Sequence, residues 1–386
     1  MLRQICEFYS PIKVVFGNGA IRVIGSELGR REAKSVFIVT DPVIVESGVL
    51  DVARAVIREH GISVYTFADV EAEPTDACVV NALGELKTKC CDTVLGVGGG
   101  SCLDVAKVVA LMAMHSGEVE DLLGHDRVLR RGLPTILVPT TAGTGSEVSN
   151  VAVLRNSVDG NKVGITSTYV LPDMAIVDPE LTVTLPPEIT ANTGLDAFSQ
   201  SLEPYLSLSA NPFSDLVAER AISLIWRHLP KAFQRGDIIE NRYWMSFAAT
   251  LSGMAFCSGK VTAVHALSYA FSGKQALPHG RAVAIMLPHV LEDAVVNCKV
   301  KLARCASLMG AKVDGLPVEV AALETVDAVK RLLQSVGVSW KLKDYGFSEA
   351  DIPLLVERAW RYRGLFSEHP RYLAEDDVYG LFRRAL

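Results

Sequence analysis

Three side chains of types that hold metal ions stand out in the second half of the sequence. Asp196 lies in the segment ITANTGLDAFSQSLEPYLS, His265 in VHALSYAFSG, and His279 in LPHG. One carboxylate and two neutral imidazoles suit zinc or ferrous iron, and a metal ion with an open coordination position polarises a substrate oxygen. Asp196, His265 and His279 are therefore candidate ligands of a metal centre. The alternative is that the histidines are hydrogen-bonded core residues, which is common on apolar helices.

A glycine-rich turn follows a predicted strand in the first half. The strand-like run at 93–95 leads into GVGGGS and then into the helical segment LDVAKVVALMAM. Ser101 and Asp104 have the spacing of a capping box, which places the glycines at the strand-to-helix turn. Backbone N–H groups at a helix N-terminus attract a pyrophosphate, and glycine lets it approach closely. The predicted cofactor-binding residues here are Gly98, Gly99, Gly100, Ser101 and Asp104, and the alternative is a plain tight turn.

A second polar loop, PTTAGTGSE, follows the apolar run TILV. Its hydroxyl groups, which include those of Thr140, Thr141 and Thr144, would suit a phosphate or a nicotinamide ribose. Earlier, the run FIVT is followed by Asp41, whose carboxylate can accept hydrogen bonds from an adenosine ribose while repelling a 2'-phosphate. These features predict a nucleotide and favour NAD over NADP. The alternative for Asp41 is an ordinary turn aspartate before Pro42.

The elements that must position these residues differ between the two halves. From residue 34 to about 180, short β-branched runs alternate with helical stretches, which predicts an α/β domain with a parallel sheet covered by helices on both faces. Past Pro186, long segments carry apolar residues at helical spacing, which predicts an all-helical domain. The LPPE segment at 185–188 is the expected boundary. We therefore predict an NAD-binding domain at 1–184 and a helical metal-binding and catalytic domain at 185–386.

The composition excludes several classes of protein. The 386 residues are 49% hydrophobic and 21% charged, as in folded globular chains, and the net charge of -6 disfavours a nucleic-acid partner. The apolar runs are too short to span a membrane, and polar residues interrupt the N-terminal segment where a signal peptide would need an apolar run. The eight cysteines show no disulfide framework. We expect a cytoplasmic protein that acts on a small molecule.

The chain resembles the iron-containing (group III) alcohol dehydrogenases, with glycerol dehydrogenase as a more distant relative. The matching stretches are GVGGGSCLDVAK, VPTTAGTGSEVS, LPDMAIVDPELT, TANTGLDAF, HALSYAFSGKQALPHGRAVAIMLPHV and HPRYLAEDDVYGLF. The resemblance implies NAD(H), a metal ion, Fe2+ or Zn2+, and a homodimer. It also implies roles for residues matched by position: Asp41 as the ribose contact, Gly99, Gly100 and Ser101 as the pyrophosphate loop, Thr140, Thr141, Thr144 and Lys162 as further cofactor contacts, and Asp196, His265 and His279 as metal ligands.

Two positions depart from the family pattern. Gln200, one helical turn after Asp196 on the same face, stands where the family has a histidine ligand. An amide oxygen is a weaker ligand than imidazole, so we expect Gln200 to be a weak ligand or to leave three protein ligands, as in glycerol dehydrogenase. Tyr269 stands where many members carry a histidine that relays protons. A phenol with an ordinary pKa near 10 is a less adaptable relay, and water or the ribose hydroxyls are the alternative.

The predicted reaction interconverts a small primary alcohol and its aldehyde, with a metal-polarised oxygen and hydride transfer to or from the nicotinamide. Two alternatives remain: a metal-independent reductase like the maleylacetate reductases of the same superfamily, and a nucleotide-binding relative without catalysis. Arg361, Arg363 and Arg371 would suit an anionic aldehyde, although arginines near a C-terminus are more commonly solvated or paired on the surface.

Overall fold

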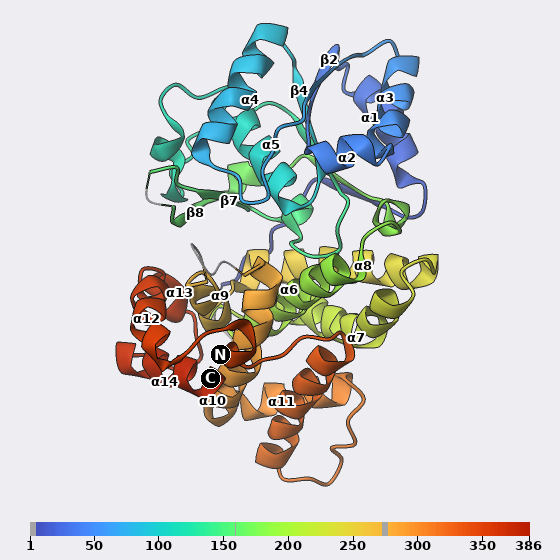
Figure 1. Ribbon diagram of the computed structural model, residues 1–386. Helices are drawn as coiled ribbons and strands as arrows, with labels where there is room; N and C mark the ends of the chain where they lie inside the picture. The colour runs from blue at the N-terminus through green and yellow to red at the C-terminus, as the bar shows by residue number, and fades with distance from the viewer. Residues whose placement is uncertain (1–4, 159, 272–276) are drawn as a thin grey trace. The chain divides into compact units, whose positions relative to one another are not determined.

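The computed structural model describes residues 5–158, 160–271 and 277–386, which form two compact units (Figure 1). Residues 9–184 form an α/β unit, and residues 5–8 with 185–386 form a helical unit. The chain passes from one unit to the other at the LPPE segment, just before helix α6 (Pro187–Leu206). Residues 5–8 belong with the helical unit, where the ring of Phe8 lies 5.7 Å from that of Phe213.

Six parallel strands form the main sheet of the α/β unit, in the order β1-β9-β6-β4-β2-β3. They are β1 (Lys13–Phe16), β2 (Ser35–Val39), β3 (Ser63–Phe67), β4 (Thr93–Gly98), β6 (Thr135–Pro139) and β9 (Met174–Val177). A smaller sheet in the order β5-β8-β7 contains β5 (Gly124–His125), β7 (Val151–Arg155) and β8 (Lys162–Thr166). The central strands are buried along their length, because in a parallel sheet both faces are covered.

Helices cover both faces of the main sheet, as predicted, with α1–α3 on one side and α4 and α5 on the other (Figure 1). These helices are α1 (Ile24–Arg30), α2 (Pro42–Glu46), α3 (Val49–Glu59), α4 (Asp76–Lys89) and α5 (Gly100–Met112). The alternation of side chains along β2 divides the core in two: Val36 and Ile38 pack with α1 and α3, and Phe37 packs with α4 and α5. The β-α alternation in the sequence therefore predicted the right architecture.

The second unit is helical, as predicted, and no strand is assigned among its described residues. Its helices are α6, α7 (Pro212–Gln234), α8 (Ile239–Gly259), α9 (Ala263–Ser268), α10 (His279–Leu308), α11 (Val318–Ser335), α12 (Ile352–Trp360), α13 (Arg363–Phe366) and α14 (Glu375–Ala385). Helix α6 packs against α7, α8 and α10 and is buried nearly all round. Polar residues on α6 are therefore enclosed by protein and need partners or a ligand.

Short 3-10 helices connect the larger elements. They are η1 (Ala20–Val23), η2 (Val119–Leu122), η3 (Ser146–Val148), η4 (Thr168–Val170), η5 (Pro179–Thr182), η6 (Leu342–Tyr345) and η7 (Glu349–Asp351). A search of the described helices finds none long and apolar enough to cross a membrane.

Candidate functional site

The three residues predicted to hold a metal lie together in the helical unit. Asp196 lies in the middle of α6, His265 lies in the short helix α9, and His279 is the first residue of α10. One ligand atom of each residue lies within 4.8 Å of the others. Asp196 Oδ1 is 3.5 Å from His265 Nε2 and 3.7 Å from His279 Nε2. The fold thus brings together side chains that are far apart in the sequence, in a group of a size that a metal ion can bridge.

Two atoms at the centre of this group are buried and have no hydrogen-bond partner within the part of the chain that the structure describes. They are Asp196 Oδ1 and His265 Nε2. Leaving buried polar atoms unpaired costs free energy, and such a pair in a native site therefore needs an explanation. Both atoms are lone-pair donors, and a bound divalent cation would satisfy both at once. The donor set therefore fits the metal ion that the sequence predicted.

The charges of the cluster also require a cation. Burial disfavours ionised Asp196, but His279 and His265 outweigh it and hold the pKa of Asp196 below its usual value. Burial also opposes the charged form of His265, but Glu203 and Asp196 outweigh it and raise the pKa of His265 to about 10. Buried negative charge therefore lies on both sides of the His265 ring. A divalent metal ion would balance that charge.

Glu203 is the residue that the sequence reasoning missed. It is buried on α6, and its Oε2 accepts a short hydrogen bond from His265 Nδ1. Its Oε1 accepts backbone hydrogen bonds from Thr262 at 2.9 Å, Val264 at 2.9 Å and His265 at 3.3 Å. One carboxylate therefore caps the N-terminus of α9 and orients the imidazole that α9 carries. The spacing of seven residues from Asp196 places both on one face of α6, and this spacing could have revealed it.

Gln200 lies beside Asp196, as its helical spacing predicted. Its amide Nε2 donates to Asp196 Oδ2 over 3.0 Å, and its Oε1 is buried without a hydrogen-bond partner among the described residues. The amide must face the carboxylate with its N–H2 group, since the reverse orientation would oppose two acceptors. Gln200 therefore leaves Asp196 Oδ1 available to the cluster. Whether Gln200 Oε1 also contacts a metal ion stays a prediction.

Gly280 allows α10 to approach α6 closely enough to bring His279 near Asp196. A Cβ atom on Gly280 would lie 1.9 Å from the backbone oxygen of Asn192, one turn before Asp196. Arg281 Nε donates to Asn192 Oδ1 over 3.1 Å at the same crossing. Backbone does not yield as a flexible side chain does, so any larger residue at 280 would displace His279.

Aromatic rings border the cluster. The ring of Tyr269 stacks on that of His279 with 5.5 Å between centroids, and Tyr362 lies 4.8 Å from Tyr269. The edge of the Tyr269 ring also faces His265 at 6.5 Å. Tyr269 is therefore placed beside the candidate metal ligands, where its role as a proton donor stays a prediction. The sequence reasoning did not single out Tyr362.

In the α/β unit, the two predicted cofactor loops lie against each other. They follow β4 and β6, which are neighbouring parallel strands, and Thr140 N donates to Gly98 O over 2.9 Å. Gly98 has a φ of 151°, a conformation that favours glycine. A Cβ atom on Gly100 would lie 2.6 Å from Thr144 Cγ2, and one on Gly99 would lie 3.6 Å from Thr141 Cγ2. The glycine and threonine loops therefore form one surface at the carboxyl edge of the sheet, the usual position of a nucleotide in such folds.

The capping box predicted for Ser101 and Asp104 is wrong. Helix α5 begins at Gly100, so its N-cap residue is Gly99, which has no side chain with which to cap the helix. Ser101 Oγ donates to the backbone oxygen of Ala72. The Asp104 carboxylate instead reaches the second loop and the strand after it, where it accepts from Ser146 Oγ and from the backbone of Val153 in β7. Long-range hydrogen bonds thus replaced the local cap, and the glycine turn keeps its first backbone N–H groups free of side-chain caps.

Asp41 and Lys162 both have partners in the α/β unit. Asp41 Oδ1 accepts from the backbone N–H of Ile44 and caps α2, and its Oδ2 accepts from the Cys102 thiol over 3.2 Å. Asp41 is therefore a helix cap before Pro42, and the capping bond leaves its contact with a ribose a prediction. Lys162 Nζ lies 2.9 Å from Glu73. Its predicted contact with the cofactor also stays a prediction.

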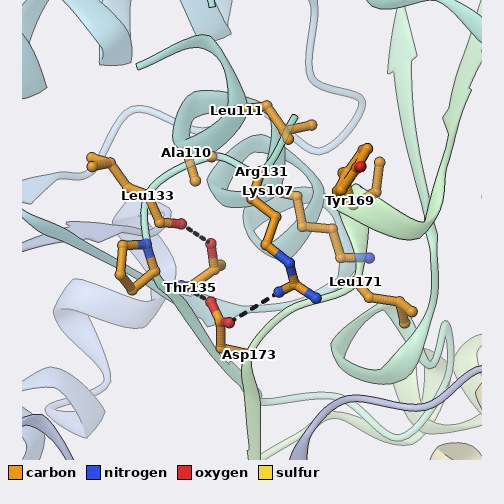
Figure 2. A pocket seen from close by; sticks show the side chains of 12 residues that line it. Lys107, Ala110, Leu111, Arg131, Leu133, Thr135, Tyr169, Leu171 and Asp173 are labelled. Atoms are coloured by element: carbon orange, nitrogen blue, oxygen red, sulfur yellow. Dashed lines mark hydrogen bonds and ion pairs between the residues drawn. The ribbon is translucent and has the colours of Figure 1, made fainter. Parts of the chain in front are cut away.

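A cavity of about 140 Å³ lies at the opposite, amino edge of the main sheet. Figure 2 shows Arg131 directed at Asp173, which immediately precedes β9, and Asp173 in turn accepts from the backbone N–H of Thr135, the first residue of β6. Lys107 also lines this cavity, but its Nζ donates to the backbone oxygens of Ser149 and Val151. The cavity therefore lies away from the glycine and threonine loops, and the residues predicted to bind the cofactor do not line it.

Two of the three arginines considered for an anionic substrate are paired with carboxylates. Arg371 forms two hydrogen bonds of 2.7 Å with the Asp293 carboxylate, and Arg361 pairs with Glu357 at 2.9 Å. Arg363 is exposed in the short helix α13. The surface-pairing alternative therefore describes Arg361 and Arg371, and the sequence cluster gives no support to an anionic substrate.

Comparisons with known proteins agree with the geometry of both units. The family described as iron-containing alcohol dehydrogenase matches residues 11–179, and the C-terminal part of the same family matches residues 190–386. The chain is 37% identical to long-chain-alcohol dehydrogenase 1 of Geobacillus thermodenitrificans, covering 98% of this chain and 95% of that protein. It is 33% identical to the NAD-dependent methanol dehydrogenase of Bacillus methanolicus, covering 98% and 99%. A crystal structure of 1,3-propanediol oxidoreductase superposes with a TM-score of 0.96 at 35% identity, covering 99% of this chain and all of that one. The chain therefore belongs to the iron-containing alcohol dehydrogenase family and is an oxidoreductase of that type.

Proposed function

We propose that this enzyme interconverts a small primary alcohol and its aldehyde, chiefly as an aldehyde reductase, with NAD(H) and a divalent metal held by Asp196, His265 and His279. The observation that carries the proposal is the pair of buried atoms Asp196 Oδ1 and His265 Nε2, which have no hydrogen-bond partner among the described residues, with His279 Nε2 beside them. When bound, the metal would polarise the substrate oxygen and the nicotinamide would carry the hydride.

The protein's own residues have separate tasks in this proposal. Asp196 offers one oxygen to the metal while Gln200 holds the other. His279 and Tyr269 stack, which fixes the imidazole plane at the border of the cluster. Asp196 and His265 are buried, which strengthens the charge interactions on which carbonyl polarisation depends. In the α/β unit, we propose that the glycine loop contacts the pyrophosphate, and that Thr140, Thr141, Thr144 and Lys162 contact the rest of the cofactor.

The substrate class is inferred from the relatives. The printed names include methanol and 1,3-propanediol, which both carry primary hydroxyl groups, and long-chain alcohols. The arginine pairs described above give no reason to add an anionic group. Another relative is named a sulfoacetaldehyde reductase. Because the arginines named above are paired or exposed, we expect uncharged aldehydes to be reduced faster than carboxylate or sulfonate analogues, and an NADH-oxidation screen over charge and chain length tests this.

Metal analysis combined with chelation tests the reaction type. We expect the purified enzyme to hold about one divalent ion per chain, to lose aldehyde reduction after chelation, and to recover it with Zn2+ or Fe2+. Metal-free protein that still reduces aldehydes would show a metal-independent reductase like the maleylacetate reductases. Protein that binds NADH without turning over any aldehyde would show a non-catalytic relative.

We also propose that the enzyme is a cytoplasmic homodimer. All eight cysteines are free thiols, which suits a reducing compartment. The dimer rests on the family resemblance alone. Light scattering on the purified protein measures the oligomeric state, and fractionation of cells measures the location.

A further inference from the structure

We propose that Glu203 is a positioning residue that holds a proton on His265 Nδ1 and so keeps the lone pair of His265 Nε2 directed at the metal cluster. The proposal rests on the proposed function, since it explains how one of the metal ligands is presented. It assigns a role in the metal centre to a residue that does not itself belong to the ligand group.

The contacts of Glu203 leave its carboxylate only one arrangement. Backbone N–H groups of Thr262, Val264 and His265 converge on Oε1, and the Thr262 hydroxyl donates to the same atom over 3.1 Å. All are donors, so Oε1 must be an acceptor. Oε2 then faces His265 Nδ1 and accepts a further hydrogen bond from Ser199 Oγ over 3.1 Å.

This arrangement decides which nitrogen of His265 carries the proton. A carboxylate oxygen has only lone pairs to offer, so Nδ1 must donate an N–H to Glu203. The other nitrogen, Nε2, is buried beside Asp196 Oδ1 and has no hydrogen-bond partner among the described residues. A neutral imidazole has one N–H and one lone pair, so Nε2 is the ligand nitrogen.

Glu203 also completes the charge balance of the site. Asp196 and Glu203 are both buried and lie on either side of the His265 ring. Two buried carboxylates with neutral imidazoles carry two negative charges, which a single divalent cation neutralises. Glu203 thereby adds to the attraction for the metal without contacting it, at a site where Gln200 is a weak ligand at best.

Glu203→Gln reverses the hydrogen bond with almost no change of shape. The glutamine oxygen must take the Oε1 position, because placing the amide N–H2 group there would oppose four donors. The N–H2 group then faces His265 Nδ1 and forces that nitrogen to become the acceptor. The proton moves to Nε2, which can no longer bind a metal.

The test is histidine 15N NMR of metal-free and zinc-loaded protein, with zinc affinity measured by chelator competition. The His265 signals are assigned from their loss in His265→Asn. We expect wild-type Nδ1 to carry a proton in both forms. In metal-free Glu203→Gln, we expect the proton on Nε2 and a 10- to 100-fold loss of zinc affinity, the usual effect of removing an orienting partner.

Thr262→Val is the matched control, because it removes a donor to the same carboxylate without altering the side that faces His265. It should keep the wild-type proton position and zinc affinity within about threefold. A Glu203→Gln protein that keeps Nδ1–H and binds zinc like the wild type overturns the proposal. If that variant does not fold, the wild-type spectrum decides: a proton on Nε2 and none on Nδ1 overturns it. Wild-type protein that binds no zinc defeats the proposed function, while the metal-free spectra still test the role of Glu203.

Discussion

The metal cluster of the helical unit and the nucleotide loops of the α/β unit are built on opposite principles. At the cluster, buried side-chain atoms of Asp196 and His265 lack hydrogen-bond partners in the part of the chain that the structure describes. At the loops, Asp41, Ser101 and Asp104 already have hydrogen bonds within the protein, and the glycines present backbone. The first region therefore depends on charge that only a ligand satisfies. The second depends on shape, so we expect substitutions there to have graded effects.

Asp196→Asn should have the largest effect, because it removes the negative charge that faces the metal position while preserving the shape of the side chain. We expect the bound metal to be lost and kcat/KM for aldehyde reduction to fall roughly 10³-fold. The metal-free variant should be less stable than metal-free wild type, because the lowered pKa of Asp196 means that its ionised form stabilises the fold at neutral pH. Metal analysis, kinetics and urea unfolding measure the three effects. Asp215→Asn is the control, because it removes a carboxylate charge in the same unit from an ion pair with Lys301. Normal metal content in Asp196→Asn would contradict the view that the cluster depends on the charge of Asp196.

Asp293→Asn provides the contrast within the helical unit, because Arg371 already satisfies both oxygens of this carboxylate. Burial alone would raise the pKa of Asp293, but His369 and Arg371 outweigh it and hold that pKa well below its usual range. The folded-state pKa is thus lower than the unfolded value of about 3.9, so the stabilisation exists above that pH and is lost as pH falls toward the folded value.

We accordingly expect Asp293→Asn to lower the free energy of unfolding by about 2 kcal/mol at pH 7 and by progressively less below about pH 4. Urea unfolding at several pH values measures this. Metal content should stay at the wild-type level. A stability difference that does not depend on pH would contradict the ionic origin of the effect.

Gly100→Ala tests the shape of the nucleotide loops. Its Cβ would press on the Thr144 side chain, which can turn aside at some cost to the loop surface. We expect KM for NADH to rise about tenfold with kcat little changed, as for a loss of uniform cofactor binding. Gly84→Ala in α4, where a Cβ meets nothing within 4 Å, is the matched control. Equal kinetics for both variants would show that NADH does not approach this loop.

Cys102→Ala should have the smallest effect. The Cys102 thiol donates to Asp41 Oδ2, while Asp41 Oδ1 stays bonded to the backbone of Ile44. Losing one weak hydrogen bond loosens the aspartate without removing it, so we expect KM for NADH to rise about threefold. Cys102→Ser should restore the wild-type value, and Cys78→Ala, another buried thiol of this unit, should not change it. An unchanged KM in Cys102→Ala would show that Asp41 is held by its capping bond alone.

Much of the fold followed from local patterns. The β-α alternation and the long helical segments predicted both units, because hydrophobic periodicity reports which face of each element is buried. The capping box at Ser101 and Asp104 failed, because a local pattern cannot show that a carboxylate has a better partner fifty residues away.

The sequence by itself determined the residue types of the metal cluster, the glycine and threonine loops, and the family. Only the tertiary structure decided that Glu203 holds His265, that Gln200 donates to Asp196, and that Gly280 lets α10 reach α6. The physical reason is that ligand type is a property of single residues, whereas proton position and ligand orientation depend on hydrogen bonds between segments that meet only in the folded chain.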